Sequence, residues 1–102
     1  MKGNSLIVCI VNQGYTDLVM EGARKAGATG GTYFKARGTG NREIEKFYGI
    51  EIKPEKEIAF IVVSNNIKEK VIKEVYASAG LDTQGQGIVF SLPVEDFVTR
   101  DV

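Results

Sequence analysis

The sequence predicts an α+β sandwich in which a four-stranded antiparallel sheet carries two helices on one face. Apolar runs of strand length alternate with segments of helical periodicity, and the order reads βαβ, a long excursion, then βαβ. Two βαβ units with right-handed crossovers close most simply into this βαββαβ arrangement, the ferredoxin-like topology. A chain of 102 residues has the size of one domain with one core, so we expect a single domain over residues 1–102.

The first βαβ unit occupies the N-terminal third of the chain. Residues 5–11 form a continuous apolar run rich in β-branched side chains, which is typical of a central strand. Thr16 is the expected N-cap of the first helix, and Gly27 is its expected stop. Residues 32–37 form the second strand. The apolar face of the helix is predicted to contain Leu18, Val19, Gly22, Ala23 and Ala26.

The second unit follows the excursion. Residues 57–63 form the third strand, and Asn66 is the expected N-cap of the second helix, with Glu69 three residues on. Gly80 is the expected stop of that helix, and residues 88–92 form the fourth strand, which Pro93 should interrupt. The apolar stripe of the helix is predicted to contain Ile67, Val71, Ile72, Val75 and Ala79.

Composition excludes several classes of function. Thirteen basic residues balance thirteen acidic ones, whereas a nucleic-acid-binding protein usually carries a basic excess. The absence of histidine removes the commonest general base and the usual zinc ligand, and Cys9 lies inside an apolar strand, where we expect a buried side chain. We therefore expect neither catalysis nor a metal site.

No segment has signal-peptide anatomy, and no apolar run approaches the roughly 20 residues that span a bilayer. We expect a cytoplasmic protein that does not insert into membranes.

With both helices on one face of the sheet, some large apolar side chains must point away from them. Such a surface predicts oligomerisation through the sheets.

Glycines and a lysine indicate an anion site. Gly38 and Gly40 end the second strand, and Gly85 and Gly87 precede the fourth. A Gly-x-Gly segment leaves amide donors uncovered and permits positive φ, so its backbone can bend around an anion. Lys56, at the start of the third strand, would add a positive charge. An ordinary turn remains the alternative for each segment taken alone.

Three stretches, "GATGGTYFKARGTG" (27–40), "EIAFIVV" (57–63) and "GQGIVFSLPVEDF" (85–97), resemble the PII nitrogen-regulatory signalling family. The resemblance covers nearly the whole chain in the same element order. It implies a homotrimer of ferredoxin-like subunits that binds ATP or ADP in the clefts between subunits. It also implies that the excursion over about 38–55 is a shortened T-loop, the segment with which the family contacts target proteins.

The resemblance also implies roles for individual residues. Gly38 and Gly40 match the base of the T-loop, where Arg42 takes the place of a glutamine that helps to hold 2-oxoglutarate and magnesium. Lys56 matches a lysine that meets phosphate. The implied ligand-binding residues are completed by Thr32, near the adenine, and by Gly85, Gln86 and Gly87, in place of a phosphate-cradling Gly-Asp-Gly.

The chain departs from the family pattern at several charged positions. Ile88 stands where the family has a lysine, and two C-terminal arginines fall on Thr99 and Asp101. Each lost charge-assisted contact is worth roughly 1.5–3 kcal/mol. We therefore expect ADP, AMP, ATP, a cyclic nucleotide or another small anion such as bicarbonate as the effector, with ATP plus 2-oxoglutarate less favoured, and no tightly bound cofactor.

Three classes of function remain open at this point. The leading one is a regulatory sensor whose T-loop engages a partner protein, for which the family suggests a membrane transporter. The second is a CutA- or ACT-like small-ligand-binding module that does not depend on nucleotides. The third, an enzyme on this fold, lacks a visible catalytic constellation.

Overall fold

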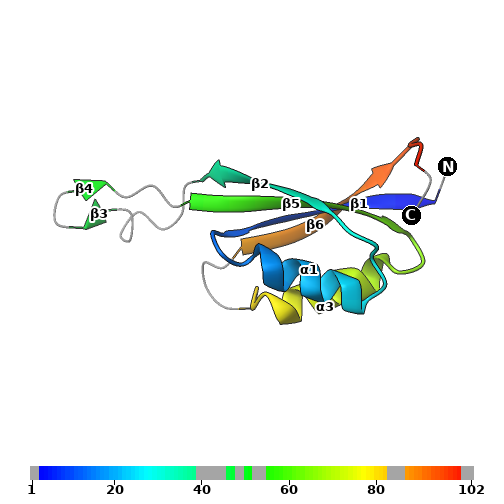
Figure 1. Cartoon of the computed structure of the whole chain (residues 1–102), viewed down its shortest axis with the longest axis horizontal. Helices are drawn as coiled ribbons and strands as arrows, with labels where there is room; N and C mark the ends of the chain where they lie inside the picture. The colour runs from blue at the N-terminus through cyan, green and yellow to red at the C-terminus, as the bar shows by residue number, and fades with distance from the viewer. Residues whose placement is uncertain (1–2, 39–45, 48–49, 52–54, 83–86, 100–102) are drawn as a thin grey trace.

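The computed structural model describes residues 3–38, 46–47, 50–51, 55–82 and 87–99. Four strands form one antiparallel sheet in the order β2-β5-β1-β6, and both helices lie against one face of it (Figure 1). This order, with its two βαβ crossovers, is the ferredoxin-like arrangement, so the predicted fold class is confirmed.

The elements have the following bounds. The strands of the main sheet are β1 (Asn4–Asn12), β2 (Thr32–Arg37), β5 (Glu55–Ser64) and β6 (Gly87–Val94). The helices are α1 (Thr16–Lys25) and α3 (Lys68–Ser78). Within the excursion, β3 (Lys46–Phe47) and β4 (Ile50–Glu51) pair only with each other. All four predicted strands and both predicted helices are present.

Both predicted helix caps are wrong. The N-cap of α1 is Tyr15, and Thr16 is the first helical residue. The N-cap of α3 is Ile67 rather than Asn66, and neither cap makes a side-chain hydrogen bond. The hydroxyl of Thr16 instead donates to a carboxylate on β5. The Thr16 side chain therefore contacts another strand and does not cap its own helix.

The buried face of α1 differs from the predicted one at a single position. Val19, Gly22, Ala23 and Ala26 are buried as expected, but Leu18 is 38% exposed and Met20 is buried in its place. At Gly22, an added Cβ would lie 2.7 Å from the Glu74 carbonyl oxygen of α3. The small residues of α1 therefore allow close approach to the other helix.

The fourth strand runs through Pro93, which the sequence prediction had placed as its interruption. β6 is an edge strand that pairs only with β1. A proline is tolerated there because an edge strand can turn its missing N–H side away from the ladder.

The core lies between the sheet and the helices. Period-two alternation turns Ile7, Cys9 and Val11 of β1 toward the helices, where each has no exposed surface. Burial raises the pKa of the Cys9 thiol to about 12, so this side chain is the inert hydrophobe that the sequence predicted. From α3, Val71 and Val75 complete the same cluster.

The opposite face of the sheet is open and apolar. The cross-strand pairs Ile88–Ile10, Phe90–Val8 and Leu92–Leu6 have the parity that points away from the helices, as do Phe34 and Phe60. Five large apolar side chains on this face are at least 39% exposed, namely Phe34, Phe60, Ile88, Phe90 and Leu92. The expected outward-facing apolar surface is therefore present.

Candidate functional site

The strand register gathers part of the predicted anion site at one end of the main sheet. Lys56 opposes Asn12 on β1, and Gly87 opposes the neighbouring Val11. Gly38 lies directly after β2, where an added Cβ would be 3.3 Å from Lys56 Cγ. Gly38 follows β2, Lys56 lies in β5 and Gly87 in β6, and all three are at the same end of the sheet.

Lys56 has an unusual partner for a half-buried cation. Its Nζ donates a hydrogen bond of 2.6 Å to Asn12 Oδ1, which is a neutral acceptor. Within the described part of the chain, no carboxylate oxygen lies within 4.0 Å of this nitrogen. The ammonium is therefore held by an amide, and no carboxylate among the described residues compensates its charge.

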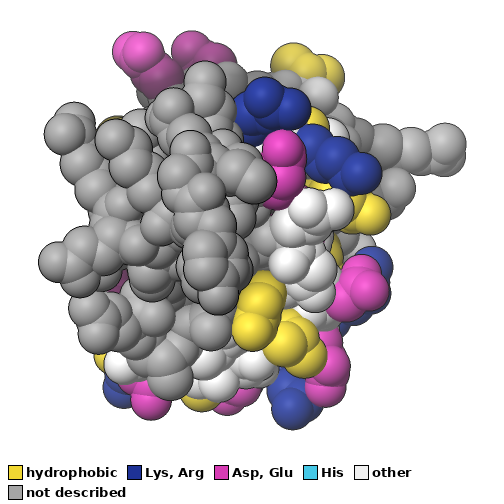
Figure 2. All heavy atoms as spheres, turned by 90° about the vertical axis from the view of Figure 1, so that its left-hand side faces the viewer, with side chains coloured by type: hydrophobic (Ala, Val, Ile, Leu, Met, Phe, Trp, Pro, Cys, Tyr) yellow, Lys and Arg dark blue, Asp and Glu magenta, His cyan; other side chains and the backbone are white. Residues whose placement is uncertain are grey.

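The adjacent charges at this end of the sheet cancel each other. Arg37 Nε lies 3.1 Å from Glu55 Oε1 across the β2–β5 ladder, with both side chains largely exposed. Figure 2 views this end of the molecule and shows basic side chains beside an acidic one, next to atoms that are not described. Arg37 therefore has a carboxylate partner, whereas Lys56 has none among the described residues.

Gly87 is required by the backbone itself. It belongs to β6 rather than to a loop, and its φ is +143°, a region that side chains rarely adopt. A Cβ at this position would lie 2.1 Å from the Ile10 carbonyl oxygen. The missing side chain makes room for strand β1, and a role of Gly87 toward an anion stays a prediction.

A buried carboxylate lies on the other side of the same edge. Glu57 is only 7% exposed and points toward the helices. Its Oε1 accepts hydrogen bonds of 2.8 Å from Thr16 Oγ1 and from the Gly14 backbone N–H. These two bonds lower the pKa of Glu57, and the charge of Lys35 across the ladder adds to the effect.

This carboxylate fastens the turn between β1 and α1 to the start of β5. The Gln13 N–H adds a third tie, since it donates to the Glu55 carbonyl oxygen at 3.2 Å. Sequence reasoning missed Asn12 and Glu57 as members of this edge. Period-two alternation could have found Glu57, because it shares its parity with the buried Ala59, Ile61 and Val63.

Of the other predicted site residues that the structure describes, Thr32 is not brought to this place. Thr32 opposes Phe60, whereas Ala36 opposes Lys56, so Thr32 lies about 13 Å away along the strands at roughly 3.3 Å per residue. The positions of Gly40, Arg42, Gly85 and Gln86 fall outside the described residues.

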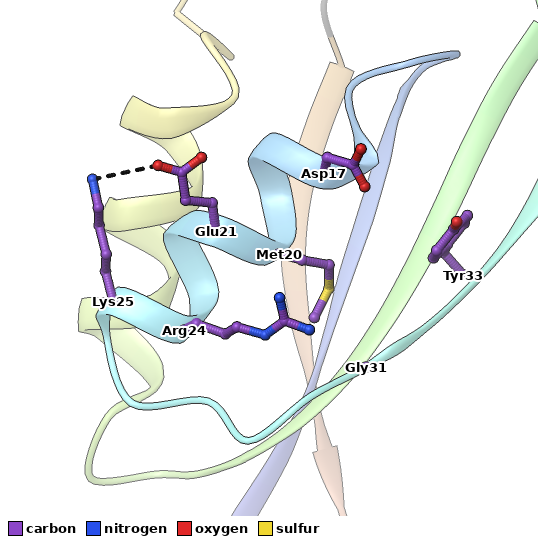
Figure 3. Close-up of a pocket in the computed structure, with 7 residues that line it drawn as sticks. All are labelled: Asp17, Met20, Glu21, Arg24, Lys25, Gly31 and Tyr33. Atoms are coloured by element: carbon purple, nitrogen blue, oxygen red, sulfur yellow. Dashed lines mark ion pairs between the residues drawn. The ribbon is translucent and has the colours of Figure 1, made fainter.

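A separate open groove of about 720 Å³ runs between α1 and β2. Figure 3 shows Arg24 reaching across it beside Met20, with Tyr33 on the opposite wall. Glu21 and Lys25 form an exposed ion pair of 3.9 Å at its helical side. The groove contains none of the predicted site residues. We place the candidate site at the end of the main sheet where Lys56 lies, because its ammonium has no carboxylate partner among the described residues.

The described residues offer neither a metal-binding cluster nor a membrane-spanning helix. No group of three or more His, Cys, Asp or Glu side chains there could hold a metal ion. No described helix is both long and apolar enough to cross a membrane.

Comparisons with known proteins agree with this architecture. The family model described as nitrogen regulatory protein P-II matches residues 4–100. A crystal structure of Arabidopsis thaliana PII bound to citrate matches with a TM-score of 0.75 and 25% identity, over 97% of this chain and 84% of that one. No curated protein matches the sequence. The chain therefore belongs to the nitrogen regulatory protein P-II family.

Proposed function

From this family membership, we propose that the chain is a PII-like signalling regulator. A small anionic effector, with an adenine nucleotide as the first candidate, binds at the end of the main sheet where Lys56 lies. The observation that carries the proposal is the half-buried Lys56 ammonium, which is hydrogen-bonded to the neutral Asn12 amide and faces no carboxylate among the described residues. A charge held in this way attracts an anion, because no acidic side chain has to be displaced first.

The chemistry around Lys56 supports a phosphate- or carboxylate-bearing effector. A lysine beside glycine backbone suits a phosphate or carboxylate oxygen. The matching Arabidopsis protein was crystallised with citrate, which is a polycarboxylate. Thr32, about 13 Å from Lys56 on the same face at roughly 3.3 Å per residue, is far enough away for the base of a nucleotide whose phosphate meets Lys56.

We further propose that the functional unit is a homotrimer, as is typical of the family. The open apolar face supplies the contact surface, since an exposed area of this kind is rarely left uncovered in a monomer. In such an assembly the predicted ligand-binding residues would line a cleft between subunits; they are Thr32, Gly38, Gly40, Arg42, Lys56, Gly85, Gln86 and Gly87.

The output of the regulator is proposed to be the segment over about 38–55, acting as a T-loop on a partner protein in the cytoplasm. The family resemblance suggests a membrane transporter as that partner. Effector binding can act only if it favours one arrangement of the segment over another. The chain has no proposed catalytic role, because its charged edge serves to bind rather than to react.

A binding panel tests the proposal. Purified protein is titrated with ATP, ADP, AMP, cyclic AMP, bicarbonate and citrate, with thermal unfolding and light scattering as readouts. We expect a trimer and at least one nucleotide that stabilises it, by about 2.7 kcal/mol at 100 times its Kd. Lys56→Met should abolish that shift, whereas Lys73→Met, on the exposed side of α3, should leave it unchanged.

Two results would contradict the proposal. One is a monomer that none of the six compounds stabilises. The other is a nucleotide shift that survives in Lys56→Met, which would move the site elsewhere. Stabilisation by citrate or bicarbonate alone would favour the small-ligand-binding module over a nucleotide sensor.

A further inference from the structure

The proposed site contains one contact whose chemistry goes beyond the choice of effector. The Lys56 side chain extends over the open face and meets Asn12, its cross-strand partner on β1. Residues directly opposite one another on antiparallel strands have Cβ atoms about 4.5–5.5 Å apart, so the pairing is built into the register. Any residue at position 12 would face the lysine in the same way.

The acceptor at position 12 decides what remains of the lysine charge. A carboxylate there would form an ion pair with Lys56, and the pair would have no net charge to offer. The amide oxygen of Asn12 holds the ammonium at 2.6 Å and leaves the charge intact. The two side chains have nearly the same shape, so this difference is electrostatic.

The two acidic side chains next to Lys56 in the sequence have other partners. Glu57 points to the opposite face, where Thr16 and Gly14 hold it. Glu55 pairs with Arg37 at 3.1 Å. Both carboxylates next to Lys56 in the sequence are therefore kept from neutralising it.

We infer that Asn12 is a positioning residue that makes Lys56 available to an anion by fixing its ammonium without compensating its charge. This inference rests on the proposed function, since it concerns the same lysine. It adds a residue that acts through Lys56 and predicts that acidity at position 12, rather than loss of the contact, silences the site.

The test uses full-length protein and two probes, sodium pyrophosphate and ADP. Asn12→Asp should preserve the fold and the melting temperature without ligand, because the aspartate still contacts Lys56. It should weaken pyrophosphate binding by about tenfold or more, equivalent to about 1.4 kcal/mol. Asn12→Ala removes the contact without adding charge and should weaken binding less than Asn12→Asp does.

Asn66→Asp is the matched control. It makes the same change in net charge at an exposed position, just after the other end of β5. We expect it to bind pyrophosphate as the wild type does. Equal losses in Asn66→Asp and Asn12→Asp would overturn the inference, because the effect would then come from overall charge.

The remaining outcomes separate the inference from the proposed function. If ADP binds the wild type and binds Asn12→Asp within about threefold as well, the inference fails and the function stands. If pyrophosphate binds, ADP does not, and Asn12→Asp loses pyrophosphate, the nucleotide function fails and the inference stands. An unfolded Asn12→Asp variant, or a wild type that binds neither probe, overturns the inference.

Discussion

Lys56 and Glu57 are neighbours in β5, yet the two faces of the sheet treat their charges in opposite ways. Glu57 lies on the covered face, where it is buried and its Oε1 accepts two hydrogen bonds. Lys56 lies on the open face, where one neutral amide holds it. The carboxylate of Glu57 is thus hydrogen-bonded on the covered face. The ammonium of Lys56, one position earlier, has only a neutral partner on the open face.

The difference separates structural from functional charge. A buried carboxylate must be hydrogen-bonded because its desolvation is costly, so the contacts of Glu57 are explained by folding alone. The open face makes no such demand on Lys56, because water can solvate its ammonium. A charge left uncompensated where folding does not require it is a candidate for binding, and the comparison points to Lys56.

The largest expected effect on stability comes from disrupting β6, which pairs with β1 next to both residues. Gly87→Val places a Cβ against the Ile10 carbonyl oxygen, in a backbone region that valine avoids. We expect at least about 3 kcal/mol of lost stability, measured by chemical denaturation. Because β6 pairs with β1, the variant should disturb this end of the sheet on both the Lys56 face and the Glu57 face.

Gly30→Ala is the control for this change. Nothing lies within 4 Å of a Cβ at Gly30, so the free energy of unfolding should hardly change. Wild-type stability in Gly87→Val would show that β6 tolerates a side chain at its first residue, which contradicts the described backbone.

The second-largest loss of stability is expected for Glu57, on the covered face of the sheet. Glu57→Gln keeps the shape of the side chain but turns two charge-assisted hydrogen bonds into neutral ones. We expect a loss of about 2 kcal/mol at pH 7 in urea unfolding. Glu69→Gln, on the exposed first turn of α3, should change stability by less than about 0.5 kcal/mol.

The same variant predicts a pH dependence. The folded-state pKa of Glu57 lies below its value in the unfolded chain, which is about 4.3. The stabilisation is therefore complete above that value and is lost as the pH falls from about 4.3 through the folded-state pKa. The gap between wild type and Glu57→Gln should shrink over this range. A gap that stays constant down to about pH 2 would mean that the pKa of Glu57 is not lowered.

The smallest effect on stability is expected on the open side. Lys56→Met removes one hydrogen bond from a half-buried cation that has no carboxylate partner among the described residues. We expect less than about 1 kcal/mol of lost stability, although anion binding should disappear. A loss as large as that of Glu57→Gln would make Lys56 a structural charge and end the contrast between the two faces.

Local patterns predicted the fold well and the caps poorly. The apolar periods located every main strand and both helices because each period records which face an element buries. Each cap was missed by one residue, since α1 is capped by Tyr15 and α3 by Ile67. The Thr16 side chain contacts Glu57, 41 residues away along the chain, and local patterns carry no record of that contact. Pro93 was misjudged because the edge position of β6 appears only once the strand order is known.

The candidate site was predicted in part. The glycine segments and the lysine predicted Gly38, Lys56 and Gly87 as site residues, and the strand register places all three at one end of the sheet. Asn12 was missed because an asparagine after an apolar strand is also what an ordinary turn looks like. Its partner Lys56 lies 44 positions further along the chain.

By itself, the sequence determined the order of elements, the inert Cys9 and the presence of an apolar open face, since these follow from local periodicity and composition. Only the tertiary structure decided that Lys56 faces Asn12 while Glu57 faces Thr16. The physical reason is register, because adjacent side chains of a strand point to opposite faces and their partners come from distant parts of the chain.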